Sequence, residues 1–255
     1  MKAEKAAVAA SETDRFATTH WSVVLSANPT RGDRHGSEAL AQLCRTYWRP
    51  IFAFVCSRGY AVSDAQDLTQ DFFVMVLEGN LLKLADPTRG RFRSLLLKSL
   101  KNFLADAAEK QRAQKRGGKL NFISWDDWMA QAPSQLSIPM TTLENLSPER
   151  VFDLRWAATI VERALQRLRE ECEGRGRRRL FELISGYLTA DRADISYASI
   201  AQKVGVTEPE VKRLLHRMRL RYRELLRHEV AQTVENAGDV DEEIRYLCVT
   251  LATAE

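Results

Sequence analysis

Helical periodicity is the sequence feature that most limits how this chain can fold. Apolar residues recur at steps of three and four along most of its length, whereas the strict alternation typical of strands is scarce. The periodic segments lie at residues 40–54, 63–76, 92–115, 148–168 and 180–188. The expected fold class is therefore all-α.

Length and charge distribution point to two helical domains and a polyanionic partner. A chain of 255 residues suits two domains of modest size. The net charge is only +4, but residues 89–119 hold ten basic and two acidic side chains, and residues 203–228 hold eight and three. Residues 62–88 and 229–255 are net negative. Two separate basic blocks favour a polyanion that is held at two places.

The cysteines and the apolar runs argue against metal binding, secretion and membrane insertion. The four cysteines lie far apart, and none stands at metal-ligand spacing from a histidine. The N-terminal Ala/Val run is too broken for a signal peptide, and no apolar run reaches about 18 residues. We expect a soluble cytoplasmic protein with reduced thiols, no metal, no cofactor and no membrane partner.

Breaks in the periodicity suggest the domain boundaries. The expected order is an N-terminal extension (1–36), a first helical domain (37–116), a linker (117–147), a second helical domain (148–227) and an acidic helical extension (228–255). The linker follows from Gly117, Gly118 and a Pro/Ser/Thr/Gln-rich stretch. Its Trp125-Asp126-Asp127-Trp128 segment is either an aromatic anchor for the linker or a docking element for a partner.

Residues 196–223 have the pattern of a helix-turn-helix. Apolar positions before and after a Gly205-Val206 turn face a common core, and Thr207 with Glu210 forms a capping box for the second helix. Such a second helix enters the DNA major groove. The candidate DNA-binding residues here are Thr207, Glu208, Glu210, Lys212, Arg213, His216 and Arg217. The alternative is an ordinary helical hairpin with a solvated basic face.

The helix expected at 92–115 carries a second candidate nucleic-acid surface. Small residues flanked by cations share one face and would let a phosphate backbone approach, while Asn102 could pair with an adenine edge. The candidate residues are Arg89, Arg91, Lys98, Lys101, Asn102, Arg112 and Lys115, with Phe92 available to stack on an unpaired base. The alternative is a solvated charged face around a hydrophobic core.

The helix expected at 63–76 has an acidic face, formed by Asp64, Asp67, Gln70 and Asp71 opposite apolar positions. A negative face repels DNA but suits a basic protein surface. Paired carboxylates can also serve acid/base catalysis or bind metal, but no histidine or second acidic cluster stands at ligand spacing. We therefore expect no catalytic residues and no enzyme activity.

Three of these segments resemble those of one protein family in the family's order. DAQDLTQDFF (Asp64 to Phe73) resembles the polymerase-binding helix of bacterial extracytoplasmic-function (ECF) sigma factors. FRSLLLKSLKNFLADAAEKQRAQKR (Phe92 to Arg116) resembles their promoter-melting helix. SYASIAQKVGVTEPEVKRLLHRMRLRYREL (Ser196 to Leu225) resembles their reader of the minus-thirty-five element. The resemblance covers about residues 37–116 and 148–227.

The resemblance implies a sigma factor that binds core RNA polymerase and directs promoter recognition, DNA melting and transcription initiation in a bacterial cytoplasm. It implies that the acidic face meets the clamp helices of the beta-prime subunit, and that the beta flap is a further part of core polymerase that this chain contacts. Lys98, Lys101 and Asn102 would engage the minus-ten element, and Lys212, Arg213 and Arg217 the minus-thirty-five element. An anti-sigma protein is a further partner that such a factor can have.

Two other function classes account for part of the sequence. A freestanding helix-turn-helix regulator would leave the acidic helix and the second basic block unexplained. A nucleic-acid-processing enzyme would need a carboxylate or histidine cluster for metal.

The C-terminal extension is the part that the resemblance explains least. Val240, Ile244, Leu247 and Leu251 form one apolar stripe on a segment that is too short to be a stable helix alone. Because the segment is acidic and follows a basic block, we expect it to fold back on the helix-turn-helix and screen it from DNA. Simple packing with no effect on DNA is the alternative.

Overall fold

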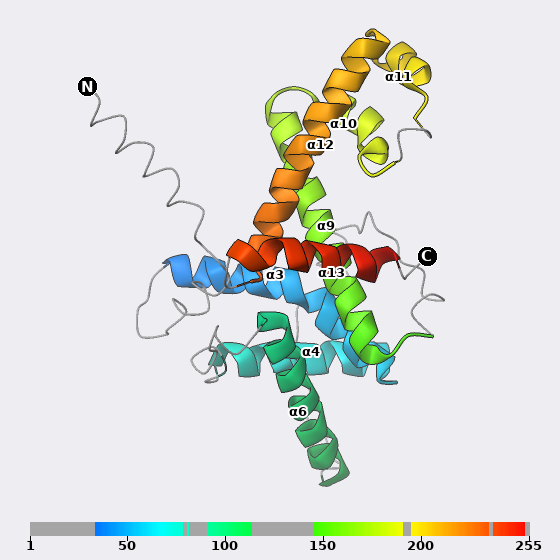
Figure 1. Cartoon of the computed structure of the whole chain (residues 1–255). Helices are drawn as coiled ribbons and strands as arrows, with labels where there is room; N and C mark the ends of the chain where they lie inside the picture. Colours follow the sequence, from blue (N-terminus) through cyan, green and yellow to red (C-terminus); the bar gives the residue numbers. More distant parts are fainter. Residues whose placement is uncertain are drawn as a thin grey trace, which may run out of the picture. The chain divides into compact units, whose positions relative to one another are not determined.

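The fold is helical throughout the residues that the structure describes. The computed structural model describes residues 34–78, 81, 91–113, 145–190, 195–234 and 237–252, and these contain α-helices and short 3-10 helices but no strand (Figure 1). The α-helices are α3 (Arg34–Ser57), α4 (Val62–Glu78), α6 (Phe92–Ala113), α9 (Pro148–Gly174), α10 (Arg178–Ile184), α11 (Tyr197–Val204), α12 (Glu208–Ala231) and α13 (Val240–Ala252). The 3-10 helices are η3 (Ser185–Tyr187) and η5 (Ala237–Asp239). The all-α expectation is confirmed.

The chain divides into two compact units. Unit 1 contains the described residues up to Ala158 together with those from Ala231 onward, and unit 2 contains Thr159–Val230. Helices α9 and α12 each contribute to both units. None of the described helices combines the length and the apolar character that a membrane crossing requires.

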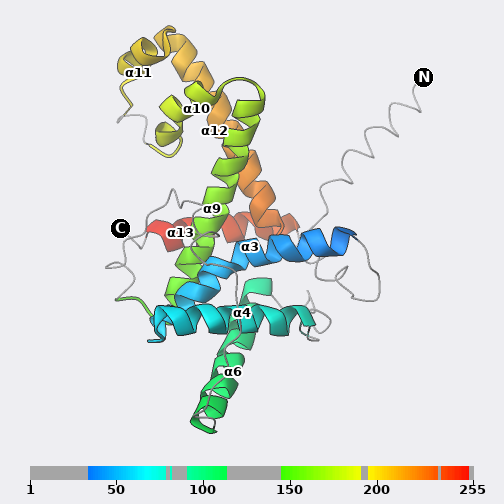
Figure 2. The ribbon, with the colours of Figure 1, turned by 180° about the vertical axis from the view of Figure 1, so that it is seen from behind.

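Aromatic side chains dominate the core of unit 1. Helix α4 lies alongside α3 in both views (Figure 1, Figure 2), and α6 packs on α4. Tyr47 of α3 meets Phe92 of α6 edge to face with 5.6 Å between ring centroids, and Phe72 of α4 meets Phe103 in the same way at 5.6 Å. These contacts leave the other faces of α4 and α6 exposed.

The first turns of α9 and the whole of α13 complete unit 1. Helix α9 begins as its sequence predicts, because the carbonyl of Ser147 accepts the first helical bond from the Val151 N–H at 3.0 Å and Pro148 occupies the first helical position. Leu251 of α13 packs against Val151 and Leu154 of α9. Val240 and Leu247 of α13 are buried as well.

The position of α13 corrects one expectation. Its apolar stripe is buried or partly buried, and α13 belongs to the compact unit that contains α3, α4 and α6, whereas the predicted helix-turn-helix belongs to unit 2. The expectation rested on closeness in sequence and on net charge. Specific arginines at the start of α6 attract the carboxylates of α13 instead, as described below.

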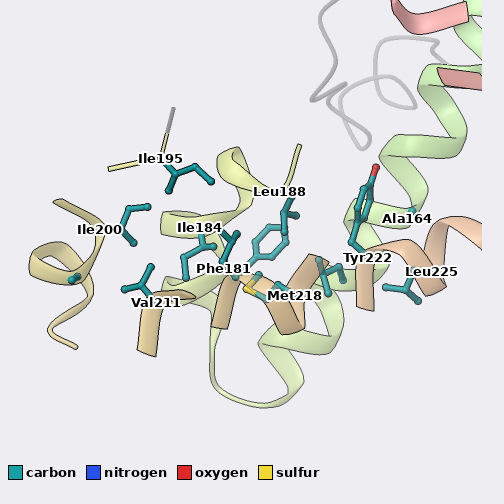
Figure 3. Packing of buried hydrophobic residues seen from close by; sticks show 13 residues of the cluster. Ala164, Phe181, Ile184, Leu188, Ile195, Ile200, Val211, Met218, Tyr222 and Leu225 are labelled. Carbon is teal, nitrogen blue, oxygen red and sulfur yellow. The ribbon is translucent and has the colours of Figure 1, made fainter. Parts of the chain in front are cut away.

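Unit 2 has its own hydrophobic core (Figure 3). The last turns of α9, with α10, α11 and α12, surround it, and the buried residues come from all four helices and the segments that join them. They are Ala164, Leu168, Phe181, Ile184, Leu188, Ile195, Ile200, Ala201, Val211, Leu215, Met218, Tyr222 and Leu225. Because this core fixes α12 along one face, the opposite face of its first turns points to solvent.

Candidate nucleic-acid interface

The start of α12 is fixed by a glycine and a capping box. Gly205 ends α11 in the left-handed region with φ of 76°, and the N–H groups of Gly205 and Val206 both bond to the carbonyl of Ala201. The Glu210 carboxylate accepts hydrogen bonds from the backbone N–H and the hydroxyl of Thr207, each at 2.8 Å. The predicted turn is confirmed. Of the predicted capping box, the bond from the Thr207 N–H to the Glu210 carboxylate is present, whereas the Glu210 N–H bonds to the backbone carbonyl of Thr207 and not to its hydroxyl.

The capping box gives two of the candidate DNA contacts a structural role. The N–H and hydroxyl of Thr207 hold the pKa of Glu210 below its ordinary value, with a smaller contribution from Arg213. Thr207 and Glu210 therefore hold the first turn of α12 in place. That turn positions the cationic residues that follow it.

Exposed cations line the outward face of α12. Lys212, Arg213, His216 and Arg217 are exposed there, and the carboxylate-bearing Glu208 is exposed beside them. Arg213, His216 and Arg217 border a hollow of about 370 Å³ that is completed by Val206, Glu210 and Leu214. The Lys212 ammonium lies 5.0 Å from the centroid of the Tyr197 ring. This face presents a compact group of nitrogen donors to solvent.

Two arginines farther along α12, Arg219 and Arg221, join this helix to neighbouring segments. Arg219 donates from Nη2 to the carbonyls of Tyr187 and Ala190, so it ties α12 to the segment after α10. Arg221 makes two bonds to the carboxylate of Glu171 in α9, at 2.8 and 2.6 Å. The run of basic residues in the sequence thus splits into an outward group and a group that joins helices.

Helix α6 holds the second candidate surface in part. Lys98 and Asn102 are exposed on α6. Lys101 is half exposed, and its ammonium lies 2.7 Å from the carboxylate of Glu149 at the start of α9. This hydrogen bond from Lys101 holds the pKa of Glu149 below its ordinary value. The candidates Arg89 and Lys115 lie outside the described residues, as does the side chain of Arg112, whose backbone belongs to α6.

Arg91 forms ion pairs with two neighbouring glutamates of α13. Its carbonyl accepts a helical bond from the Ser94 N–H, so Arg91 sits at the start of α6. Its Nη2 lies 3.0 Å from the Glu242 carboxylate and its Nε lies 3.1 Å from the Glu243 carboxylate. The structure therefore places this candidate DNA contact within an internal ion-pair cluster.

Arg93 is the centre of that cluster, and the sequence analysis did not single it out. Its guanidinium lies between the rings of Trp156 and Tyr246, 4.6 and 4.2 Å from their centroids, and its side chain is only 6% exposed. Glu243 lies 3.4 Å away, and Asp153, 3.6 Å away, also accepts a hydrogen bond from the Tyr246 hydroxyl at 2.7 Å. The only sequence signal was a cation at position 93 inside an apolar segment.

Glu243 is the buried acidic member of the cluster. Its side chain is 1% exposed, and desolvation raises its pKa against the lowering effect of Arg93 and Arg91. Among the described residues, no group donates a hydrogen bond of good geometry to either of its carboxylate oxygens. Glu243 is therefore held by the charges of Arg91 and Arg93 and not by hydrogen bonds of good geometry.

The acidic face of α4 is exposed. Asp64, Asp67 and Asp71 all point outward, and Gln70 is half-buried. Partial burial and the neighbouring Asp67 raise the pKa of Asp71. Apolar residues join this face, since Val74 is 48% exposed and Leu77 38% exposed. A negative surface with exposed apolar side chains suits a basic protein partner.

Comparisons with known proteins identified no relative of this chain. No protein-family model, no curated protein and no solved structure matches the chain. Among the described residues, no group of three or more histidine, cysteine, aspartate or glutamate side chains is arranged to hold a metal ion.

Proposed function

We propose that this chain is a sigma factor of the ECF type, which binds core RNA polymerase and directs promoter recognition, DNA melting and transcription initiation. The observation that carries the proposal is the outward face of α12. Its cations stand directly after a glycine turn and a capping box, in the first turns of the helix, where a recognition helix contacts base edges. In this proposal α11 and α12 form the helix-turn-helix that reads the minus-thirty-five element.

The other unit supports the remaining parts of the activity. The exposed acidic face of α4, with Val74 and Leu77 beside it, suits the basic clamp helices of the polymerase. The exposed Lys98 and Asn102 on α6 suit the backbone and an unpaired base of melted minus-ten DNA. Melting in this proposal is driven by binding, because base capture and cationic contacts offset the cost of unpairing.

Co-purification with core RNA polymerase separates this proposal from its rivals. The core enzyme should come from the organism that encodes the chain. The expected result is a stable complex in gel filtration. A chain that binds duplex DNA but never binds core polymerase would instead be a freestanding regulator, and a chain that cleaves or modifies DNA would be a processing enzyme. Either result would overturn the proposal.

A further inference from the structure

Helix α13 contacts the start of α6 through a group of ion pairs. Three sources of positive potential meet there, namely Arg91, Arg93 and the amino end of the α6 dipole. The carboxylates of Glu242 and Glu243 on α13 neutralise this positive potential. A nucleic-acid phosphate would meet the same donors in the same way, because carboxylate and phosphate oxygens both accept from guanidinium groups.

We propose that α13 is an internal competitor of nucleic acid, one that occupies Arg91 in the free protein and must leave that arginine before a phosphate can bind to it. The proposal rests on the proposed function, in which Arg91 lies beside the helix that captures melted DNA. The Nε and Nη2 donors of Arg91 both face α13 carboxylates. A phosphate and α13 therefore exclude each other at these donors.

Three features would allow an anion to displace α13 from Arg91. Arg91 is 32% exposed and Glu242 is 65% exposed, so water and a competing anion can reach this pair. The buried Glu243 lacks a hydrogen bond of good geometry within the described part of the chain, so its desolvation is incompletely compensated. Helix α13 has 13 residues and is too short to persist once it is detached.

Binding of a single-stranded oligodeoxynucleotide by the full-length chain tests the competition. Glu242→Gln keeps the shape of an exposed side chain and removes its charge. We expect this variant to bind a fluorescein-labelled oligonucleotide about two- to five-fold more tightly at low salt, the range that an exposed ion pair supports. The gain should shrink as added salt screens the charges.

Two controls distinguish release of Arg91 from a general change of charge. Glu78→Gln removes the same charge from an exposed position on α4 and should leave the affinity nearly unchanged. In an Arg91→Gln background, Glu242→Gln should give no gain, because the residue that it frees is gone. A gain that persists without Arg91 would overturn the proposal, as would unchanged affinity of the folded Glu242→Gln chain.

Hydrogen exchange gives a reading that does not depend on a variant. Competition is reciprocal, so the oligonucleotide should speed amide exchange across residues 240–252 of the wild-type chain. Unchanged or slower exchange at saturating oligonucleotide would contradict the inference while leaving the proposed function intact. If neither the free chain nor its complex with core polymerase binds the oligonucleotide, the proposed function fails and the inference fails with it.

Discussion

At the scale of the residue, arginines that look equivalent in the sequence have different roles. Arg213 and Arg217 border the hollow on the outward face of α12, whereas Arg219 bonds to backbone carbonyls and Arg221 to the carboxylate of Glu171. Arg91 is bound by carboxylates of α13, and Arg93 is enclosed between two aromatic rings. The surroundings of each guanidinium therefore decide whether its substitution affects binding or stability.

Arg213→Ala tests the binding role. If Arg213 makes a bidentate base contact, the change should cost about 1–3 kcal/mol on the preferred duplex and relax the preference at one base step. Binding of duplex variants by the polymerase complex measures both effects. If every duplex lost the same affinity, and the slope of log binding constant against log salt concentration fell by about one, Arg213 would contact a phosphate. Arg213 would then position the helix and not read a base.

Glu171→Gln tests the structural role of Arg221. Arg221 holds the pKa of Glu171 below its ordinary value of 4.5, so the stabilisation is complete above that pH and is lost as the pH falls through the lowered pKa. We expect the variant to lose about 0.5–1 kcal/mol of unfolding free energy at neutral pH and nothing in strong acid. Urea denaturation followed by circular dichroism measures the difference.

The matched control for that pair is Glu224→Gln. Glu224 also pairs with Arg221, but through one bond and from a more exposed side chain. Its loss at neutral pH should be smaller than that of Glu171→Gln. An equal or larger loss would show that the α9 to α12 bond is not the stabilising contact of Arg221.

At the scale of the element, short sequence signals at helix ends predicted local structure correctly, whereas the apolar stripe of α13 did not identify the helices against which α13 packs. The Gly205 turn, the bond from the Thr207 N–H to the Glu210 carboxylate and the start of α9 at Pro148 occur as the sequence predicts, because each depends on residues at most four apart. The exposed acidic face of α4 follows from the same local periodicity. The partner of α13 could not be found this way, since Arg91 and Glu242 are separated by most of the chain.

Gly205→Ala tests whether the turn positions α12. A side chain in the left-handed region costs about 1–2 kcal/mol, although no atom within 4 Å would meet the added Cβ. We expect a corresponding loss of stability in unit 2 and weaker duplex binding. Gly186→Ala is the control, because Gly186 also has open space around it but no positive φ. Equal stability of the two variants would contradict the role given to the turn.

Asp71→Arg tests the acidic face of α4. The change places a cation where the proposal puts a basic polymerase surface, so we expect affinity for core polymerase to fall about ten-fold or more. The fold should survive because Asp71 is exposed. Glu170→Arg, the same change of charge at an exposed position on α9, is the control. Unchanged co-purification of a folded Asp71→Arg chain would refute the assignment.

At the scale of the whole molecule, two surfaces of opposite charge would serve one activity under the proposed function. Unit 2 offers exposed cations on α12, and unit 1 offers an acidic face on α4 with exposed Lys98 and Asn102 on α6. Block charges in the sequence predicted both kinds of surface. They could not show that carboxylates of unit 1 already occupy Arg91 and Lys101, because net charge does not report which groups meet.

Transcription by purified core polymerase on a pool of genomic DNA fragments tests the central claim most directly. With the chain added, we expect transcripts that begin at a few defined positions, and with core enzyme alone or with the Asp71→Arg chain we expect none of them. A shared sequence upstream of those start sites would identify the promoter. If the wild-type chain binds core polymerase but produces no defined start site above core enzyme alone, the chain is not a sigma factor.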